Sequence, residues 1–340
     1  MISSQVTDTK ANPENSMKSD AQKFIDCLDD AVRLLDDNPT IHFPVTNLQL
    51  EHAPAEQFDL ALFEQWSDAC EPAEQKQSPI RIIHHLSCTG GTLIGKFLAA
   101  MPNVSLLSEV NPLSTMDDEH RAGFAPTDMI YLTRQARFPL ANELSQKLFK
   151  ADIQVILEHI RNLGRYLILR EHSHSFYHVD PTPNEVDSIR EFLNENHSLL
   201  SIVTVRHPID SYLSLLNNDW LRFSPATFDE YCRRYLLFLE SHKNEPVFKY
   251  EMLIDNVQEQ MKLICEVLSL PFSEDFLDLF DLFQLSGDSG RASSTIGRRS
   301  RRKYNSEFVQ EANQSSMYSR LCEELDYDPV LTDPEVSEQL

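Results

Sequence analysis

The chain has 340 residues, of which 41% are hydrophobic, and its formal net charge at pH 7 is −23. This length and composition suit one large domain or two small ones with a sizeable core. The negative charge argues against nucleic acid and anionic membranes as partners, and no apolar run reaches the roughly 20 residues that cross a bilayer. The six cysteines are widely spaced and form no CxxC pair, which indicates a cytoplasmic protein without a disulfide framework or a zinc ribbon.

The first 78 residues precede the pattern of the main domain. Residues 1–19 are polar, and we expect them to form a disordered tail. In residues 20–78, apolar side chains recur at helical spacing around Phe24–Leu35 and again around Phe58–Trp66, which predicts a helical extension. Such an extension would cap the core or support a homodimer.

Alternating strand and helix patterns begin at Pro79 and continue to about residue 330. The expected strands are Ile80–His85, Val104–Leu107, Tyr166–Arg170, Leu199–Val205 and Val247–Tyr250. The expected helices are 91–100, 128–135, 143–162, 184–194, 209–216, 226–242, 254–268 and 306–325. Because the strands are almost continuously apolar, we predict an α/β domain over 79–330, with a parallel sheet flanked by helices. A C-terminal tail would follow at 331–340, and ligands would bind at the carboxyl ends of the strands.

The first expected strand leads into a glycine turn and then a helix. Gly90 and Gly91 stand at this turn, and the free backbone N–H groups of a helix N-terminus bind anions. We therefore expect a phosphate site here. The spacing from Gly90 to Gly95 and Lys96 also matches the loop of ATPases and GTPases, but Phe97 replaces the Ser or Thr that holds Mg²⁺ in those proteins.

A second candidate phosphate site follows the fourth expected strand. Arg206 comes at the end of this strand, Pro208 suits the first turn of a helix, and Ser214 stands eight residues after the arginine. An arginine in this place can bind a phosphate with two parallel N–H groups. The pattern is weak alone, but together with the glycine turn in the same alternating fold it strongly indicates a nucleotide site.

These two segments resemble the phosphate-binding motifs of sulfotransferases that use 3′-phosphoadenosine-5′-phosphosulfate (PAPS), in particular bacterial members. The resemblance implies a P-loop-like sulfotransferase architecture that binds this co-substrate without a metal. It assigns the 5′-phosphate to Thr89, Gly90, Gly91, Thr92 and Leu93. It assigns the 3′-phosphate to Arg206 and Ser214. Where the family usually has a basic residue near the start of the loop, this chain has Cys88, and Arg170 could replace the missing charge.

The resemblance extends to the C-terminal third of the chain. Tyr250 stands where the family has a tyrosine near the nucleotide. The loop 286–304 is basic and occupies the place of a family loop that folds over the nucleotide, with Arg291 and Ser293 as its candidate contacts. The segment Leu321–Pro329 is similar to the closing helix of bacterial members.

Two residues are candidates for the catalytic base. Glu109 lies at the distance from the glycine turn at which the tyrosine-sulfating branch of the family has a catalytic glutamate. Arg170 and His172 match the Lys-x-His pattern that ends a strand in the cytosolic branch. We slightly favour Glu109, because no gap separates it from the glycine turn. In the alternative interpretation, one of the two residues only orients the acceptor, or Glu109 pairs with Arg170.

Three histidines near this point raise the question of a metal. His172, His174 and His178 would share one face if they lay on a strand. We favour ordinary hydrogen-bonded roles for His174 and His178, and we predict no metal ligands.

The sequence therefore predicts transfer of a sulfuryl group from PAPS to a hydroxyl or amine of a small-molecule, carbohydrate or peptide acceptor. We expect the segment 112–165 to shape the acceptor pocket. The alternatives are a P-loop-type phosphotransferase that uses ATP and a nucleotide-binding protein without catalytic activity.

Overall fold

The computed structural model describes residues 78–114, 127–137, 142–180, 188–285, 296–298 and 300–331. The expected tail 1–19, nearly all of the expected extension 20–78, the candidates Arg291 and Ser293, and most of the tail 331–340 lie outside the described residues. The described residues fall within one unit of the chain, Glu74–Leu340.

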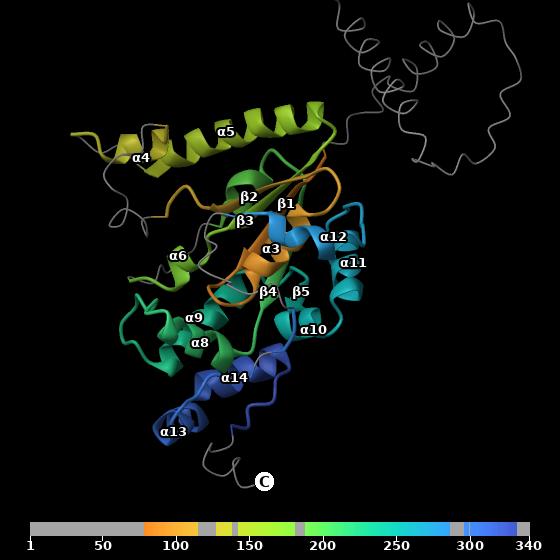
Figure 1. The fold of residues 1–340 in the computed structure, drawn as a ribbon. Helices are drawn as coiled ribbons and strands as arrows, with labels where there is room; N and C mark the ends of the chain where they lie inside the picture. The colour runs from red at the N-terminus through yellow and green to blue at the C-terminus, as the bar shows by residue number, and fades with distance from the viewer. Residues whose placement is uncertain are drawn as a thin grey trace, which may run out of the picture. The chain divides into compact units, whose positions relative to one another are not determined.

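Within the described part of the chain, five parallel strands form a sheet in the order β2-β3-β1-β4-β5 (Figure 1). The strands are β1 (Ile80–His85), β2 (Val104–Val110), β3 (Tyr166–Glu171), β4 (Leu199–Val205) and β5 (Val247–Lys249). All five expected strands are therefore present, and the predicted α/β class is confirmed. The expected fifth strand was one residue too long, because Tyr250 is the first residue of a helix. The central strand β1 is buried along its whole length, as expected for a parallel sheet covered on both faces.

Helices connect the strands and cover the sheet (Figure 1). They are α3 (Gly91–Ala99), α4 (Met129–Arg134), α5 (Asn142–Asn162), α6 (His174–Tyr177), α7 (Ile189–Asn194), α8 (Pro208–Asn217), α9 (Phe228–Ser241), α10 (Tyr250–Asp255), α11 (Val257–Val267), α12 (Phe276–Leu279), the 3₁₀ helix η1 (Phe280–Leu282), α13 (Ser306–Gln314) and α14 (Ser316–Leu325). The helix expected over 306–325 is two helices, because the Ser315 side chain accepts from the N–H of Tyr318 and caps a new one.

Alternate side chains of the strands enter two different cores. Ile83 of β1 and Ile202 of β4 pack with α3, α11 and α12, whereas Ile82 of β1 packs with α5 and α7. A third cluster joins β4 to α8, α9, α13 and α14. This alternation follows from the two-residue period of a strand.

No helix among the described residues combines the length and apolar character that crossing a membrane requires.

Candidate functional site

The glycine turn between β1 and α3 is a tight backbone passage between two aromatic rings. Gly90 has a φ of 97°, which favours glycine. A Cβ atom built on Gly90 would lie 2.5 Å from the ring of Tyr250, and one built on Gly91 would lie 2.5 Å from the ring of His85. Both positions therefore exclude a side chain, and the first N–H groups of α3 face the edge of the sheet without obstruction by a Cβ.

The hydroxyls of the turn have different roles. Thr89 is fully buried, and its hydroxyl donates to the carbonyl of Leu86 at 2.7 Å. The Thr89 hydroxyl therefore shapes the turn, and a phosphate contact of Thr89 would have to come from its backbone N–H. Thr92 accepts a hydrogen bond from Arg170 at 3.0 Å, so its own hydrogen is directed elsewhere. Leu93 packs in the core, and only its backbone N–H is suited to a ligand.

Lys96 lies inside helix α3, where it is largely buried. The helix begins at Gly91, so Gly95 and Lys96 lie more than one turn past its first residue. A lysine in this place is not positioned like the lysine of an ATPase loop.

Glu109 sits on a β-bulge at the carboxyl end of β2. The pairing of β2 with β3 shifts between Ser108 and Val110, and Glu109 has a φ of 59°. A non-glycine residue in this region is strained by about 1–3 kcal/mol and often marks a functional site. The bulge re-aims the side chain and turns the carboxylate toward the end of β3.

Arg170 connects Glu109 to the glycine turn. Its buried guanidinium lies 2.5 Å from the Glu109 carboxylate, 3.0 Å from the Thr92 hydroxyl and 2.7 Å from the Ser108 hydroxyl. Arg170, the candidate for the missing positive charge, and Glu109, the candidate base, are thus in direct contact. This is the Glu109–Arg170 pair of the alternative interpretation.

Three histidines surround the same carboxylate. The Nε2 atoms of His172, His85 and His174 lie 3.6, 3.9 and 4.0 Å from its oxygens. Burial lowers the pKa of His85 and of His174 well below 6.5, and the charge of Arg170 acts in the same direction on both, so both rings are neutral at neutral pH. The structure thus brings the candidates Glu109, Arg170 and His172 together and adds two histidines to them.

The alternate-strand arrangement of His172, His174 and His178 does not form. The chain leaves the sheet after Glu171 and enters the short helix α6. The ring of His178 packs 5.5 Å from the ring of Tyr231, away from the carboxylate of Glu109.

Arg206 lies beside the glycine turn at the carboxyl end of β4. Its side chain donates to the carbonyl of Cys88 at 3.3 Å, and its guanidinium lies 4.9 Å from the centre of the Tyr250 ring. The hydroxyl of Tyr235 accepts from the Arg206 N–H at 3.0 Å and fixes its backbone. The structure therefore places Arg206 and Tyr250, both expected from the sequence, on the same side of the turn.

Arg302 is a site residue that the sequence analysis did not select. Its Nε lies 3.4 Å from the hydroxyl of Ser214, which itself donates to the carbonyl of Asp210 at 2.8 Å. Burial raises the pKa of the Cys88 thiol to about 11, and the guanidiniums of Arg206 and Arg302 counteract this rise. Both arginines therefore lie near the start of the turn and supply the positive charge that Cys88 lacks.

Neighbouring arginines of the same basic run have other partners. Arg301 forms two hydrogen bonds with Asp210, at 2.9 and 3.0 Å, and Arg298 pairs with Asp255. The run contains six basic residues between Arg291 and Lys303, and only the fold distinguishes the arginine that faces Ser214 from those that anchor the segment.

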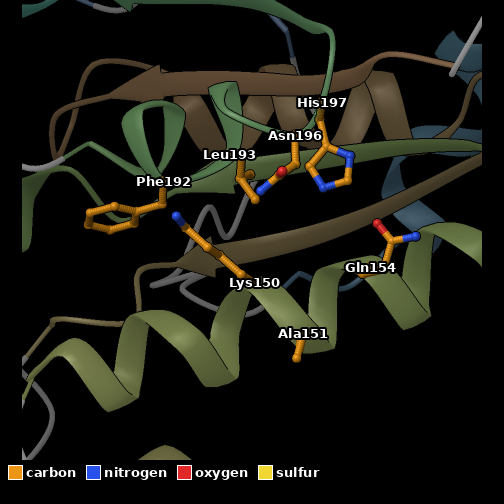
Figure 2. Close-up of a pocket in the computed structure, with 7 residues that line it drawn as sticks. All are labelled: Lys150, Ala151, Gln154, Phe192, Leu193, Asn196 and His197. Carbon is orange, nitrogen blue, oxygen red and sulfur yellow. The ribbon is translucent and has the colours of Figure 1, made fainter.

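A separate hollow of about 470 Å³ lies between α5 and the end of α7 (Figure 2). It is lined by Lys150, Ala151, Gln154, Phe192, Leu193, Asn196 and His197. His197 comes just before the amino end of β4, so the hollow lies at the opposite end of the strands from the glycine turn. None of the candidate catalytic or phosphate-binding residues lines it, and Lys150 is already paired with Glu195 at 2.7 Å.

The chain was compared with known proteins. A sequence profile of the sulfotransferase family matches residues 79–274. A comparison with curated proteins finds no significant match. Similar solved structures include the sulfotransferase domain of the olefin synthase from Synechococcus PCC 7002, with 20% identity and a TM-score of 0.47 over 76% of this chain and 98% of that one.

Two further similar structures are more distant in sequence. Sulfotransferase STF9 from Mycobacterium avium has 13% identity and a TM-score of 0.38, over 79% of this chain and 81% of that one. Mouse sulfotransferase SULT7A1, solved in complex with PAP, has 12% identity and a TM-score of 0.35, over 74% of this chain and 94% of that one.

The match to the family profile covers more than half of the chain. It includes the glycine turn, the bulge at Glu109, the end of β3 and the Arg206–Ser214 segment. The chain belongs to the sulfotransferase family, as its two phosphate motifs predicted.

Proposed function

We propose that this sulfotransferase transfers a sulfuryl group from PAPS to a hydroxyl or amine of a small-molecule, carbohydrate or peptide acceptor. One observation carries the proposal: the guanidinium of Arg170 contacts both the Thr92 hydroxyl of the glycine turn and the carboxylate of Glu109. A group held by the turn would therefore lie within reach of a base, which is the arrangement that in-line transfer requires.

The two ends of the nucleotide would occupy two separate anion sites. The N–H groups at the start of α3 and the Thr92 hydroxyl suit the 5′-phosphate, because they combine a helix N-terminus with a polar hydrogen. Arg206, Ser214 and Arg302 suit the 3′-phosphate, because Arg302 contacts the Ser214 hydroxyl and the charges of both arginines act on Cys88 at the start of the turn. The ring of Tyr250 lies between the turn and Arg206, where it would contact the nucleotide.

In the proposed reaction, the acceptor oxygen or nitrogen attacks sulfur while the bond from sulfur to the 5′-phosphate oxygen breaks. The acceptor proton passes to the base, and the electron pair of the broken bond stays on the phosphate oxygen. The products are the sulfated acceptor and 3′,5′-adenosine bisphosphate (PAP). The α3 N–H groups, Thr92 and Arg170 would stabilise the charge that develops on the leaving phosphate.

Glu109 is our preferred base, with His172 as the second candidate. The bulge and the strained backbone hold the Glu109 carboxylate at the edge of the site, where 15% of its side chain is exposed. His172 lies 3.6 Å from that carboxylate, and its Nδ1 lies 3.1 Å from the Ser114 hydroxyl. This arrangement also suits a histidine that orients the acceptor.

Two measurements test the proposal. Calorimetry in the presence of a chelator should show binding of PAP and weaker binding of ATP, because Phe97 stands where ATPases have the Ser or Thr that holds Mg²⁺. Transfer of labelled sulfate from PAPS should then be measured over a panel of alcohol, phenol, amine, carbohydrate and peptide acceptors. A strict requirement for Mg²⁺ or a preference for ATP would favour a phosphotransferase, and binding of PAP without transfer to any acceptor would favour a non-catalytic nucleotide-binding protein.

A further inference from the structure

Three imidazole nitrogens converge on one carboxylate at the edge of the sheet. The Nε2 atoms of His172, His85 and His174 lie 3.6, 3.9 and 4.0 Å from the oxygens of Glu109. One ligand atom from each of His85, Glu109 and His174 lies within 4.8 Å of the other two. These separations are longer than ordinary hydrogen bonds, so the groups converge on a common point without closing a direct contact.

The far side of two of these rings is held by the protein. Nδ1 of His85 lies 3.2 Å from the carbonyl of Leu86, to which only a protonated nitrogen can donate. Its Nε2 therefore carries a lone pair in the neutral ring. Nδ1 of His172 lies 3.1 Å from the Ser114 hydroxyl. Histidines that bind metals use their second nitrogen in the way that His85 does, because the hydrogen bond fixes the tautomer and the ring orientation. Among the described residues, no hydrogen-bond partner reaches Nδ1 of His174.

Burial adds a second, independent observation. His85 is only 3% exposed, and within the described part of the chain no hydrogen-bond partner reaches its Nε2 atom. A buried imidazole lone pair that faces a carboxylate requires a proton donor, a water molecule or a cation between the two groups. The distances to Glu109 leave room for such an occupant.

We propose that His85, Glu109 and His174 bind one first-row transition-metal dication of the Zn²⁺ type, with His172 beside it. Metal–nitrogen bonds of 2.0–2.1 Å place two ligands of a tetrahedral ion about 3.3 Å apart. The ligand atoms of the three side chains now lie within 4.8 Å of one another, so they would have to move closer together to bind the ion. Two imidazoles and one carboxylate favour Zn²⁺, Co²⁺ or Ni²⁺ over Mg²⁺ and Ca²⁺.

Arg170 limits this site but does not fill it. Its guanidinium lies against Oε1 of Glu109, the oxygen that Nε2 of His85 also faces, whereas His172 and His174 face Oε2. The positive charge of Arg170 lowers the affinity for a cation, while the ion pair holds the carboxylate in position. If Glu109 is the base of the proposed transfer, the bound cation would block it and act as an inhibitor.

A second cluster shows what a closed network looks like. His84, Glu171 and His242 also lie close together. The carboxylate of Glu171 already accepts from His84 at 2.5 Å, from the N–H of Ile189 at 2.8 Å and from two serine hydroxyls at 2.9 and 3.0 Å. These partners saturate its oxygens, so we assign this cluster to a structural hydrogen-bond network and not to a metal.

Binding of Co²⁺ to the purified full chain, free of nucleotide and treated with chelator, tests the proposal through the visible absorption of the ion. One Co²⁺ should bind per chain, and Zn²⁺ should displace it. His174→Ala should weaken binding about tenfold or more, whereas His197→Ala, in the separate hollow, should bind Co²⁺ like the wild type. The proposed site would be overturned if His174→Ala bound Co²⁺ as tightly as the wild type, or if His197→Ala lost as much Co²⁺ affinity as His174→Ala. The absence of absorption bands up to millimolar Co²⁺ would overturn it as well.

A second variant keeps the test decisive if His174→Ala does not fold. Glu109→Gln retains the size of the side chain and removes its charge, and it should also lose the Co²⁺ bands. Circular dichroism and PAP calorimetry show whether each variant is folded. Inhibition by Zn²⁺ that a chelator reverses is measured separately, so metal binding without sulfate transfer contradicts only the proposed function, and transfer without metal binding contradicts only the metal site.

Discussion

Arg170 lies 2.5 Å from the carboxylate of Glu109, and the same guanidinium donates to the hydroxyl of Thr92 at 3.0 Å. One buried cation thus joins the carboxyl ends of β2 and β3 to the first turn of α3. Because each of these contacts uses a different N–H group of a rigid planar fork, a shift of the glycine turn would also move Glu109.

Arg206 and Lys96 should contribute very differently to the affinity for PAP. Arg206→Ala should weaken PAP binding by roughly 2–4 kcal/mol, because it removes a charge-assisted contact to a phosphate. Lys96→Ala should change the affinity little, because Lys96 lies inside α3. Calorimetry with both variants checks the pair. Loss of binding in Lys96→Ala together with a silent Arg206→Ala would show that the turn works like that of an ATPase.

Arg302 should act on the 3′-phosphate alone. Arg302→Ala should reduce the affinity for PAP about tenfold, and it should leave the affinity for adenosine 5′-phosphate, which lacks the 3′-phosphate, nearly unchanged. Arg298→Ala is the matched control from the same segment, because its ion pair with Asp255 is exposed and contributes little. Equal losses for both nucleotides would mean that Arg302 only holds the segment in place.

Gly90 has a left-handed backbone and a close contact with the Tyr250 ring, whereas Gly164 has only the left-handed backbone. Comparing the two glycines therefore separates the cost of the backbone from that of the ring contact. Gly90 has a φ of 97° and its Cβ would clash with Tyr250, whereas Gly164 has a φ of 65° and open space around it. Gly164→Ala should cost about 1–2 kcal/mol of unfolding free energy and leave PAP binding intact. Gly90→Ala should cost more and also weaken PAP binding. Urea unfolding measures the loss of stability, and calorimetry measures PAP binding. Equal effects of the two substitutions would show that the contact of Gly90 with the Tyr250 ring has no role.

The strands and the general place of the site could be predicted from the sequence because buried parallel strands are nearly continuous apolar runs. The glycine turn and Arg206 stand directly after such runs, so their neighbourhood followed from the rule that ligands bind at the carboxyl ends of strands. The strand order β2-β3-β1-β4-β5 could not be predicted from these patterns, because it depends on how the crossovers pack.

The details of the site depend on contacts between distant residues. The bulge at Glu109 has no local signal, since neither a glycine nor a proline marks it. His85 was expected at a strand end from which it could touch the phosphate loop, and its ring lies against Gly91. Its position beside Glu109 requires the packing of three strands. Arg302 is one of several arginines in a basic run, and only the docking of that run onto α8 brings it to Ser214.

Buried histidines should make the fold sensitive to acid. Burial, followed by the charge of Arg234, lowers the pKa of His178 from 6.5 to about 3. Below pH 6.5 the unfolded chain therefore binds a proton that the folded protein does not, so the stability is complete above pH 6.5 and falls as the pH approaches 3. His178 alone should cost about 1.4 kcal/mol per pH unit in this window, or about 2 kcal/mol between pH 6.5 and 5.

His178→Phe tests this prediction, because the ring of His178 packs against Phe223 and Tyr231. Urea unfolding at several pH values should give parallel curves for the variant and the wild type above pH 7. Below pH 6.5 the variant should lose less stability. The same slope in both proteins down to pH 5 would show that His178 is protonated without cost in the folded state.

The identity of the base is tested by comparing Glu109→Gln with His172→Ala. Removal of a base slows the chemical step and spares nucleotide binding, so both variants should bind PAP like the wild type. We expect Glu109→Gln to slow single-turnover transfer by roughly 10²–10⁴-fold, because the strained bulge at Glu109 places its carboxylate against Arg170 at the edge of the site. His172→Ala should have a smaller effect if it only orients the acceptor. A larger loss in His172→Ala would identify the histidine as the base, and nearly wild-type turnover in both variants would show that another residue accepts the proton.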